Sequence, residues 1–498
     1  MWYHTHVVVT SSVDAGAPPL IDRHDELTSL RALLRRPGAS LALVTGRRRV
    51  GKTFLLDHAW PAPSTFLFTA TRTTPTQNRR QLVLDLAAWS GEPWDPDDFP
   101  SWRAVFDLLW RTHAGRPLAI VLDEFQYLAA DAEGLAEVAS ALNATFERRP
   151  VDRPLVVTLS GSAVSTLDAL ASGGAPLYGR LALHLRMEPL AVHHLAAFVP
   201  SWSPRDVVAA FGMLGGTPAY WAQLDPSAEL HDDVARLLLA RDGRVRQAID
   251  TLILQEEGLG EPAAYTAIVR AIAAGRVTRT RIADATGLKA DPSLVRRLDR
   301  LVALGWLAIV PVEEAPANAP VRYRLVDPAL RFHHAFVMPN ASLLERTDPA
   351  EVMRSAIAPR LDTFLGPAFE DLAAPTYDRL RSANGWPMVQ RWSRWEGADR
   401  QRRPLEVDVV APLMGGGVMS GAVKWNRRPI GVDVFAAHLE AVRRAADAGL
   451  RWAHAAVDGP LLFLTAAGVD ERFARAAEAH PRPVIVLTLD HVLASGTA

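Results

Sequence analysis

Short apolar segments alternate with stretches of helical spacing through the first part of the chain. Between the segments, apolar residues recur three or four positions apart, as in Asp25–Arg36 and Thr53–Ala59. Strands that alternate with helices in this way form a parallel sheet with helices on both faces. The pattern therefore predicts an α/β fold whose first strands are Leu41–Thr45, Thr65–Thr69, Leu118–Leu122 and Leu155–Ser160.

The pattern changes twice further along the chain. From about Val192 to Glu257 the spacing is mostly helical, interrupted by Gly215-Gly216-Thr217-Pro218, which predicts a helical lid. Residues 262–312 give three helical patterns and then a β-like stretch, the order of a small winged helix. After Pro339, helices and strands alternate again and indicate a second α/β domain. Its predicted strands are Met388–Trp395, Leu405–Ala411, Gly421–Trp425, Leu461–Thr465 and Val484–Leu489, with helices at Val434–Ala446 and Glu471–His480.

These changes divide the chain into five predicted parts. A loose lead-in covers residues 1–19, and the first α/β core covers 20–190. The helical lid covers 191–260, the winged helix-turn-helix 261–338 and the C-terminal domain 339–498.

Composition excludes several classes of function. The net charge of −1 excludes a wholly basic nucleic-acid binder, so any such contact must come from a local patch. The absence of cysteine excludes disulfides, thiolate nucleophiles and thiolate metal sites. The longest apolar run, Leu301–Val312, is interrupted by Gly305 and Pro311, and the N-terminus lacks a signal-peptide pattern. We therefore expect a cytoplasmic protein with no membrane span.

A glycine-rich loop, Gly46-Arg47-Arg48-Arg49-Val50-Gly51-Lys52-Thr53, follows the first predicted strand and opens a helix. Its glycines let the backbone turn tightly, so that N–H groups and the helix N-terminus face phosphate oxygens. Lys52 is then expected to bridge the β- and γ-phosphates of ATP, and Thr53 to bind Mg²⁺. The other nucleotide contacts predicted here are Gly46, Arg48, Arg49, Val50, Gly51 and Phe54.

Two acidic residues follow the third predicted strand. Asp123 is expected to hold Mg²⁺ together with Thr53, and Glu124 to orient the water that attacks ATP. This pair makes ATP binding and hydrolysis the leading interpretation. Glu124 keeps one alternative role, that of a plain helix-capping acid.

With these motifs the chain resembles the archaeal-type ATPases of the STAND branch of the AAA+ superfamily, which are prokaryotic signalling or defence ATPases. The resemblance covers nearly the whole chain. It rests on Ile21-Asp22-Arg23-His24-Asp25-Glu26-Leu27, Gly46 to Thr53, Val121-Leu122-Asp123-Glu124-Phe125-Gln126-Tyr127, Leu159-Ser160-Gly161-Ser162, Pro176-Leu177-Tyr178-Gly179-Arg180 and Gly215-Gly216-Thr217-Pro218.

The resemblance implies further residues of the nucleotide site. Ile21 and Arg23 would form the adenine side of the pocket, and Ser160 or Ser162 would sense the γ-phosphate.

It also implies two residues that respond to the nucleotide. Arg180 would be an arginine finger, and if a neighbouring copy supplies it, the ATPase works only as an oligomer. Pro218 would link the nucleotide state to the lid. The plainer alternatives are a surface arginine at position 180 and a simple turn at Gly215–Pro218.

Residues 282–304 have the proportions of a helix-turn-helix. Ile282–Thr286 and Ser293–Leu304 are the predicted helices, and the second carries an apolar side opposite a basic one. Residues 276–300 hold seven cations and three anions, an excess that suits phosphate contacts. The alternative is a winged helix that joins two domains and has a solvated basic face. Ser293, Arg296, Arg297 and Arg300 form the predicted basic side, and Leu294, Leu298 and Leu301 the apolar side.

The C-terminal domain resembles the poorly characterised domain that follows these ATPases, itself similar to the PD-(D/E)XK nuclease fold. Glu370, Asp408 and Lys424 match three of the four positions that such a nuclease needs for Mg²⁺ and catalysis. Ala422 stands where the family pattern has an acidic ligand, which weakens a hard-cation site. Glu406 lies two residues before Asp408, on the same strand face, and could substitute for that ligand or be a solvated charge.

The sequence therefore predicts a slow, ATP-driven switch, in which the nucleotide state moves the lid and winged helix and changes what the C-terminal domain contacts. Two alternatives stay open: a DNA-binding regulator with a structural nucleotide site, and an ATP-dependent nuclease. The predicted cofactors are ATP and Mg²⁺. The predicted partners are DNA, a second copy of the chain or another protein, and no membrane.

Overall fold

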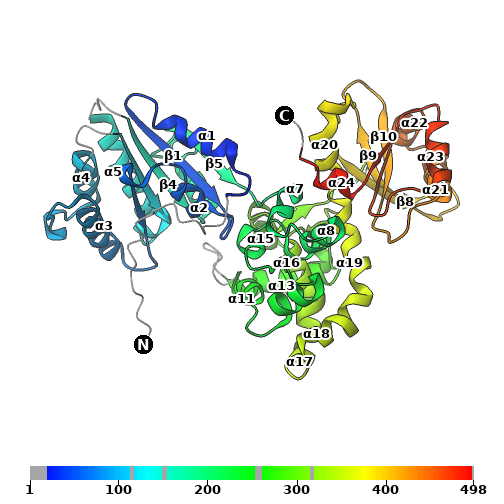
Figure 1. Cartoon of the computed structure of the whole chain (residues 1–498), viewed down its shortest axis with the longest axis horizontal. Coiled ribbons are helices and arrows are strands. Elements are labelled where there is room, and N and C mark those ends of the chain that lie inside the picture. The colour runs from blue at the N-terminus through cyan, green and yellow to red at the C-terminus, as the bar shows by residue number, and fades with distance from the viewer. Residues whose placement is uncertain (1–19, 113–116, 149–153, 253–260, 315–318, 496–498) are drawn as a thin grey trace. The chain divides into compact units, whose positions relative to one another are not determined.

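The computed structural model describes residues 20–112, 117–148, 154–252, 261–314 and 319–495 (Figure 1). The predicted lead-in, residues 1–19, lies outside this description, as do residues 253–260 of the predicted lid. The chain divides into two compact units, with the boundary between Pro189 and Leu190. Among the described residues, no helix is both long and apolar enough to cross a bilayer.

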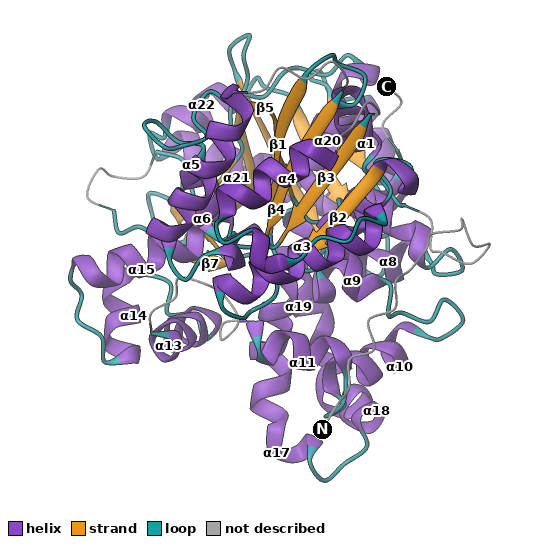
Figure 2. Cartoon of the chain, turned by 90° about the vertical axis from the view of Figure 1, so that its left-hand side faces the viewer, coloured by secondary structure: helices purple, strands orange, loops and turns teal. Residues whose placement is uncertain are grey.

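The first unit is built on a five-stranded sheet in the order β2-β3-β4-β1-β5, in which every pair of neighbours is parallel (Figure 2). The predicted parallel sheet is therefore confirmed. Strand β5 was not predicted, because this edge strand alternates half-buried and exposed residues and lacks a continuous apolar run. The strands are β1 (Ala39–Gly46), β2 (Thr65–Thr69), β3 (Leu118–Asp123), β4 (Leu155–Gly161) and β5 (Leu181–Met187).

Helices cover both faces of this sheet. Leu41 and Leu43 of β1 face the core under α3, α4 and α5, whereas Ala42 and Val44 face α1 and α2. Strands buried on both faces read as nearly continuous apolar runs, which is why the sequence predicted them well. The helices are α1 (His24–Leu33), α2 (Lys52–Asp57), α3 (Pro75–Ser90), α4 (Trp102–Thr112), α5 (Ala132–Arg148) and α6 (Val164–Leu170), with short 3₁₀ turns η1 (Ala62–Ser64), η2 (Pro96–Asp98) and η3 (Phe125–Leu128).

The second unit begins with the helices of the predicted lid and the winged helix. The lid consists of α7 (Val192–Leu195), η4 (Ala196–Phe198), α8 (Pro204–Leu214), α9 (Pro218–Trp221), α10 (Leu230–Val234), the π-helical turn η5 (Ala235–Leu239) and α11 (Arg244–Asp250). The winged helix consists of α13 (Pro262–Ala273), α14 (Arg279–Thr286), α15 (Pro292–Ala303) and the antiparallel strands β6 (Leu307–Ile309) and β7 (Tyr323–Leu325). A run of helices follows: α16 (Pro328–Phe332), η6 (His333–Val337), η7 (Met338–Asn340), α17 (Ala341–Leu344), α18 (Pro349–Val352), η8 (Met353–Ile357) and α19 (Ala358–Glu370).

The C-terminal sheet has the order β12-β11-β10-β9-β8 and is mixed: β8, β9 and β10 pair antiparallel, and β10, β11 and β12 pair parallel. The prediction of a strand at Met388–Trp395 was misplaced, because Val389 and Trp392 pack against the core and the strand begins only at Ser393. The elements are α20 (Ala373–Asn384), β8 (Ser393–Ala398), β9 (Pro404–Pro412), β10 (Val418–Lys424), α21 (Val432–Asp447), α22 (Arg451–Ala456), β11 (Leu461–Thr465), α23 (Glu471–Glu478), β12 (Val484–Leu487) and α24 (Leu489–Leu493).

The lid shares a hydrophobic core with the C-terminal domain. Val192 and Val208 of the lid belong to the same buried cluster as Phe369 and Val409. Helices α8 and α19 approach so closely at Gly212 that a Cβ there would lie 2.5 Å from Leu365 Cδ2. The lid helices and the C-terminal domain therefore form one packed body.

Candidate functional site

The glycine-rich loop joins β1 to α2 and depends on two glycines. Gly51 has a φ of +93°, in the left-handed region that other residues avoid. At Gly46 a Cβ would lie 2.6 Å from the carbonyl oxygen of Met187 in β5. A larger residue at position 46 would therefore separate the loop from the neighbouring strand.

Lys52 begins α2 and is buried, with its ammonium group turned back into the loop. Its Nζ donates to the carbonyl oxygens of Gly46 at 2.8 Å and Arg47 at 3.2 Å. A compact ammonium can exchange such neutral acceptors for phosphate oxygens without moving the helix. The loop thus holds a positive charge at its centre.

The other predicted loop residues have different surroundings. Arg48 donates to the hydroxyl of Tyr127 at 2.7 Å, and Arg49 has a left-handed φ of +68°. Val50 is buried in the core beneath the sheet, so its side chain faces away from solvent. Phe54 packs its ring against His58 on the next turn of α2.

Thr53 and Asp123 meet across the sheet edge. Thr53 Oγ1 donates to Asp123 Oδ2 at 2.6 Å, and Asp123 is buried at the end of β3. The carboxyl ends of β1 and β3 lie at the same edge because the strands are parallel. A hydroxyl beside a carboxylate supplies the hard oxygen donors that Mg²⁺ prefers, so these two residues fit the predicted ion.

Glu124 is tied by its side chain to Ser162 at the end of β4 and to Gln126 in the turn η3. It precedes η3 in a left-handed conformation, with a φ of +50°, but makes no side-chain capping hydrogen bond. Its Oε2 accepts from the Ser162 hydroxyl at 3.0 Å, from the Ser162 amide at 3.4 Å and from Gln126 Nε2. The geometry therefore gives no support to the alternative role of Glu124 as a capping acid.

The two candidate sensors lie in different places. Ser160 is fully buried inside β4, and within the described part of the chain its hydroxyl has no hydrogen-bond partner. Ser162 follows the strand and contacts Glu124. Gln126, which the sequence motif contains but to which no role was assigned, lies over Gly161 so closely that a Cβ at that glycine would be 2.1 Å from Gln126 Oε1.

The residues carried over from the family resemblance are divided between the two units. Arg23 is buried and donates to the Glu188 carbonyl at 2.6 Å. This hydrogen bond joins the start of α1 to the end of β5, and Ile21, two residues before Arg23, is half-buried. Arg180 is exposed in the turn before β5. Pro218 belongs to the second unit, where it occupies the first turn of α9.

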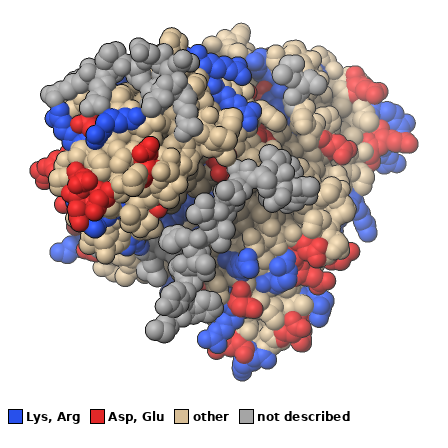
Figure 3. Space-filling model, turned by 60° about the vertical axis from the view of Figure 1, so that its left-hand side comes forward, with Lys and Arg blue, Asp and Glu red and all other residues tan. Residues whose placement is uncertain are grey.

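Helix α15 of the winged helix has the predicted apolar and basic sides. Leu294, Leu298 and Leu301 are buried, and Arg296 is exposed. Arg297 donates to Glu261 at 2.7 Å, so part of its charge is already compensated. A pocket of about 280 Å³ lies here, lined by Glu261, Tyr265, Ser293, Arg296 and Arg297. On the molecular face drawn in Figure 3, cationic and anionic side chains of the described residues are interspersed.

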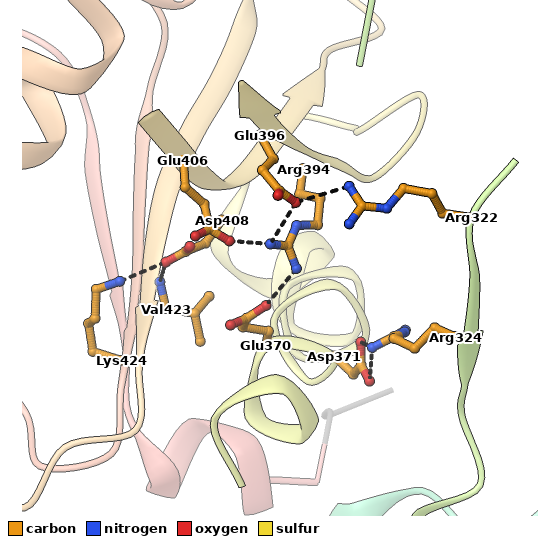
Figure 4. A network of polar contacts seen from close by, with 10 residues as sticks. All are labelled: Arg322, Arg324, Glu370, Asp371, Arg394, Glu396, Glu406, Asp408, Val423 and Lys424. Carbon is orange, nitrogen blue, oxygen red and sulfur yellow. Dashed lines mark hydrogen bonds and ion pairs between the residues drawn. The ribbon is translucent and has the colours of Figure 1, made fainter. Parts of the chain in front are cut away.

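The C-terminal candidates do converge, as Figure 4 shows. Glu370 ends α19, Glu406 and Asp408 lie on β9, and Lys424 ends β10. Lys424 Nζ and the Val423 amide both donate to Asp408 Oδ2 at 2.9 Å.

An arginine that the sequence analysis did not consider lies among these carboxylates. Arg394 of β8 donates to Glu370 Oε2 at 3.4 Å and also to Glu406, so the guanidinium bridges α19 and β9 (Figure 4). Glu406 is thus in contact with Arg394. No spacing rule could have predicted this, because the register of β8 against β9 contains a bulge between Ser393 and Trp395.

Burial and neighbouring charges act on Glu370. Burial and, to a smaller extent, the nearby Asp408 raise the pKa of this carboxyl to about 7, while Arg394 opposes the rise. Ala422 is buried in an apolar cluster with Ile430 and Phe435 and supplies no ligand. The described residues include no group of three or more acidic or histidine side chains placed to hold a metal ion. At position 422 the C-terminal residues therefore lack the acidic ligand that the family pattern places there.

The parallel sheet, the loop between β1 and α2 and the Thr53–Asp123 pair define a P-loop nucleotide-binding fold for the first unit. Residues 333–434, in the second unit, match the family DUF234, described as archaeal and bacterial proteins of unknown function.

The chain is also similar to proteins of low sequence identity over much of its length. It is 24% identical over 399 residues to the uncharacterized protein MJECL04 of Methanocaldococcus jannaschii, a match covering 78% of this chain and 84% of that protein. Among solved structures it is similar to the Walker-type ATPase PABY2304 of Pyrococcus abyssi, with 20% identity, a TM-score of 0.44 and coverage of 64% of this chain and 96% of the other. It is also similar to the Aeropyrum pernix ORC2 protein, with 15% identity, a TM-score of 0.42 and coverage of 68% and 96%.

Proposed function

We propose that the chain binds ATP with Mg²⁺ in the loop between β1 and α2 and hydrolyses it slowly. The observation that carries this proposal is the meeting of Lys52, Thr53 and Asp123 at one edge of the parallel sheet. A cation, a hydroxyl and a carboxylate in this order are what a triphosphate and its magnesium ion require.

Each side chain of the site would have a separate role in ATP hydrolysis. Lys52 would exchange its two carbonyl acceptors for phosphate oxygens, while the backbone amides of residues 47–51 bind the phosphates from the helix N-terminus. Thr53 and Asp123 would hold Mg²⁺, which neutralises charge on the phosphates. Glu124 would orient the attacking water, with its carboxylate kept in place by Ser162 and Gln126.

We further propose that the second unit responds to the nucleotide as one body. The lid and the C-terminal domain share a core, and Arg205 of α8 lies 4.2 Å from the ring of Trp425 and donates to the Asn426 carbonyl at 2.7 Å. A displacement of the lid would therefore carry the C-terminal domain with it. This supports an ATP-driven switch whose output lies in residues 190–498.

Calorimetry and phosphate release on the full-length chain test the ATP site. We expect Lys52→Ala to weaken ATP binding about thirtyfold or more, since a charged hydrogen bond contributes about 2 kcal/mol. Glu124→Gln should retain binding and lower kcat by about a hundredfold, because it removes the carboxylate that positions water. Arg35→Ala and Glu137→Gln, at exposed positions of the same unit, are matched controls. Unchanged ATP binding by Lys52→Ala would contradict the proposal.

A second candidate function is DNA binding with a structural nucleotide site. The exposed Arg296 and the pocket beside it favour this candidate, because accessible arginines contact the phosphates of DNA. A DNA-binding regulator would be favoured over a switch by two results. DNA would leave the rate of ATP hydrolysis unchanged, and bound nucleotide would exchange too slowly to control DNA binding. The third candidate, an ATP-dependent nuclease, loses support from the contacts of Arg394 and the burial of Ala422.

A further inference from the structure

The acidic face of the C-terminal domain consists of five carboxylates that come together only in the fold. Glu370 and Asp371 close α19, Glu396 lies on β8, and Glu406 and Asp408 lie on β9 (Figure 4). We propose that this acidic face binds arginines of the same chain instead of a divalent cation, and that it is the junction that fixes the winged helix to the C-terminal domain.

The centre of the junction is Arg394. Its guanidinium contacts Glu370 and Glu406, and it lies 4.0 Å from Glu396. A planar guanidinium offers several N–H donors in one plane, so a single arginine can serve carboxylates from three elements. With Lys424 on Asp408, every carboxylate that a metal ion would need already has a cation from the chain.

The rim of the junction is formed by two arginines of the wing. Arg324 of β7 donates to both oxygens of Asp371 at 2.5 and 2.6 Å, and Arg322 donates to Glu396 at 3.3 Å. Both contacts of Arg324 come from Nη1, so one nitrogen is shared between the two carboxylate oxygens.

The segment that follows β6 of the wing reaches the same sheet through its backbone. Val312 forms a parallel bridge with Arg394, and the Glu313 amide donates to the Arg394 carbonyl at 3.2 Å. The Glu313 side chain is buried and accepts from Arg391 and from Ser393 Oγ at 3.0 Å.

The residue that follows extends this attachment to a helix. Glu314 accepts from the amides of Trp452 at 2.6 Å and Arg451 at 3.1 Å, at the start of α22. The wing is thus held by a backbone bridge and a helix cap in the segment after β6, and by arginine–carboxylate pairs at and next to β7. These contacts act together, whereas a single exposed ion pair contributes little.

Hydrogen exchange on the full-length chain tests the junction. Arg324→Glu places like charges together, so we expect the amides of β6 and β7 to exchange about fivefold faster or more. The double variant Arg324→Glu/Asp371→Arg should restore slow exchange, and Arg346→Glu, at an exposed position of the same unit, should change nothing. If Arg324→Glu fails to fold, Arg324→Gln gives the same test with a smaller effect. Unchanged exchange in the folded single variant, or failure of the double variant to restore it, would overturn the proposal.

Manganese titration tests the exclusion of a metal ion. Asp123→Asn serves as the parent, because it removes the P-loop carboxylate, and it is compared with Asp123→Asn/Asp408→Asn by electron paramagnetic resonance. We expect identical Mn²⁺ binding by the two variants. A site in the parent that the Asp408 substitution removes would show that the acidic face holds a cation after all.

Discussion

The hydroxyl of Ser162 donates a 3.0 Å hydrogen bond to Glu124, and so joins the end of β4 to the end of β3. Ser162→Ala should lower kcat for ATP hydrolysis about tenfold, since a hydrogen bond to a charged group is worth about 1.5 kcal/mol. The KM for ATP should not change, because Ser162 positions the carboxylate and not the substrate. Steady-state phosphate release measures both constants, and Ser162→Thr, which keeps a hydroxyl, should recover part of kcat. An unchanged kcat would mean that Gln126 alone holds Glu124.

Arg180 is exposed before the edge strand β5, where a second copy of the chain could meet it. We expect Arg180→Ala to reduce kcat by about a thousandfold, the usual effect of losing an arginine finger. Mixing the Arg180→Ala and Glu124→Gln variants should then restore activity. The Arg180→Ala copy supplies a site with an intact Glu124, and the Glu124→Gln copy supplies Arg180 to that site. Phosphate release from the mixture and from each variant alone measures this. A mixture no more active than the sum of its parts would place Arg180 outside any shared site.

The basic side of α15 predicts a salt-dependent contact with duplex DNA. Arg296→Ala should reduce the slope of log affinity against log salt by about one, because one phosphate contact is lost. Glu261→Gln should raise affinity, since it releases Arg297 from its ion pair. Fluorescence anisotropy across a salt series reports both, with Arg472→Ala of α23 as the control. A flat salt dependence in the wild type would remove the DNA-binding candidate.

Glu370 makes the stability of the second unit depend on pH. Its pKa rises from 4.5 to about 7 on folding, so between these values the folded chain retains a proton that the unfolded chain has lost. The resulting stabilisation is complete below about pH 4.5 and is lost as the pH rises through 7. Glu370→Gln should therefore raise the melting temperature at pH 8 and weaken its dependence on pH. Calorimetric melting between pH 5 and 8 checks this, with exposed Glu478→Gln as the control.

The sequence by itself determined the parts of the protein that depend on neighbouring residues along the chain. One apolar run is followed by Gly46–Thr53, and another by Asp123 and Glu124. Each run predicts a strand and the place where it ends, and the residues that follow predict the kind of site at that end. The structure has both segments at the carboxyl ends of parallel strands. Edge strand β5 was not predicted, because its side chains alternate between exposed and half-buried positions and give no apolar run.

Tertiary structure decided every feature that depends on which segments become neighbours. Ser162 reaches Glu124 because β4 lies between β1 and β3, an order that no local pattern encodes. The charges of the C-terminal face become an arginine-bridged junction because α19, β8, β9 and the wing converge there. Coulombic contacts act through space and ignore sequence separation, so Arg394 could be assigned its partners only after the chain was folded.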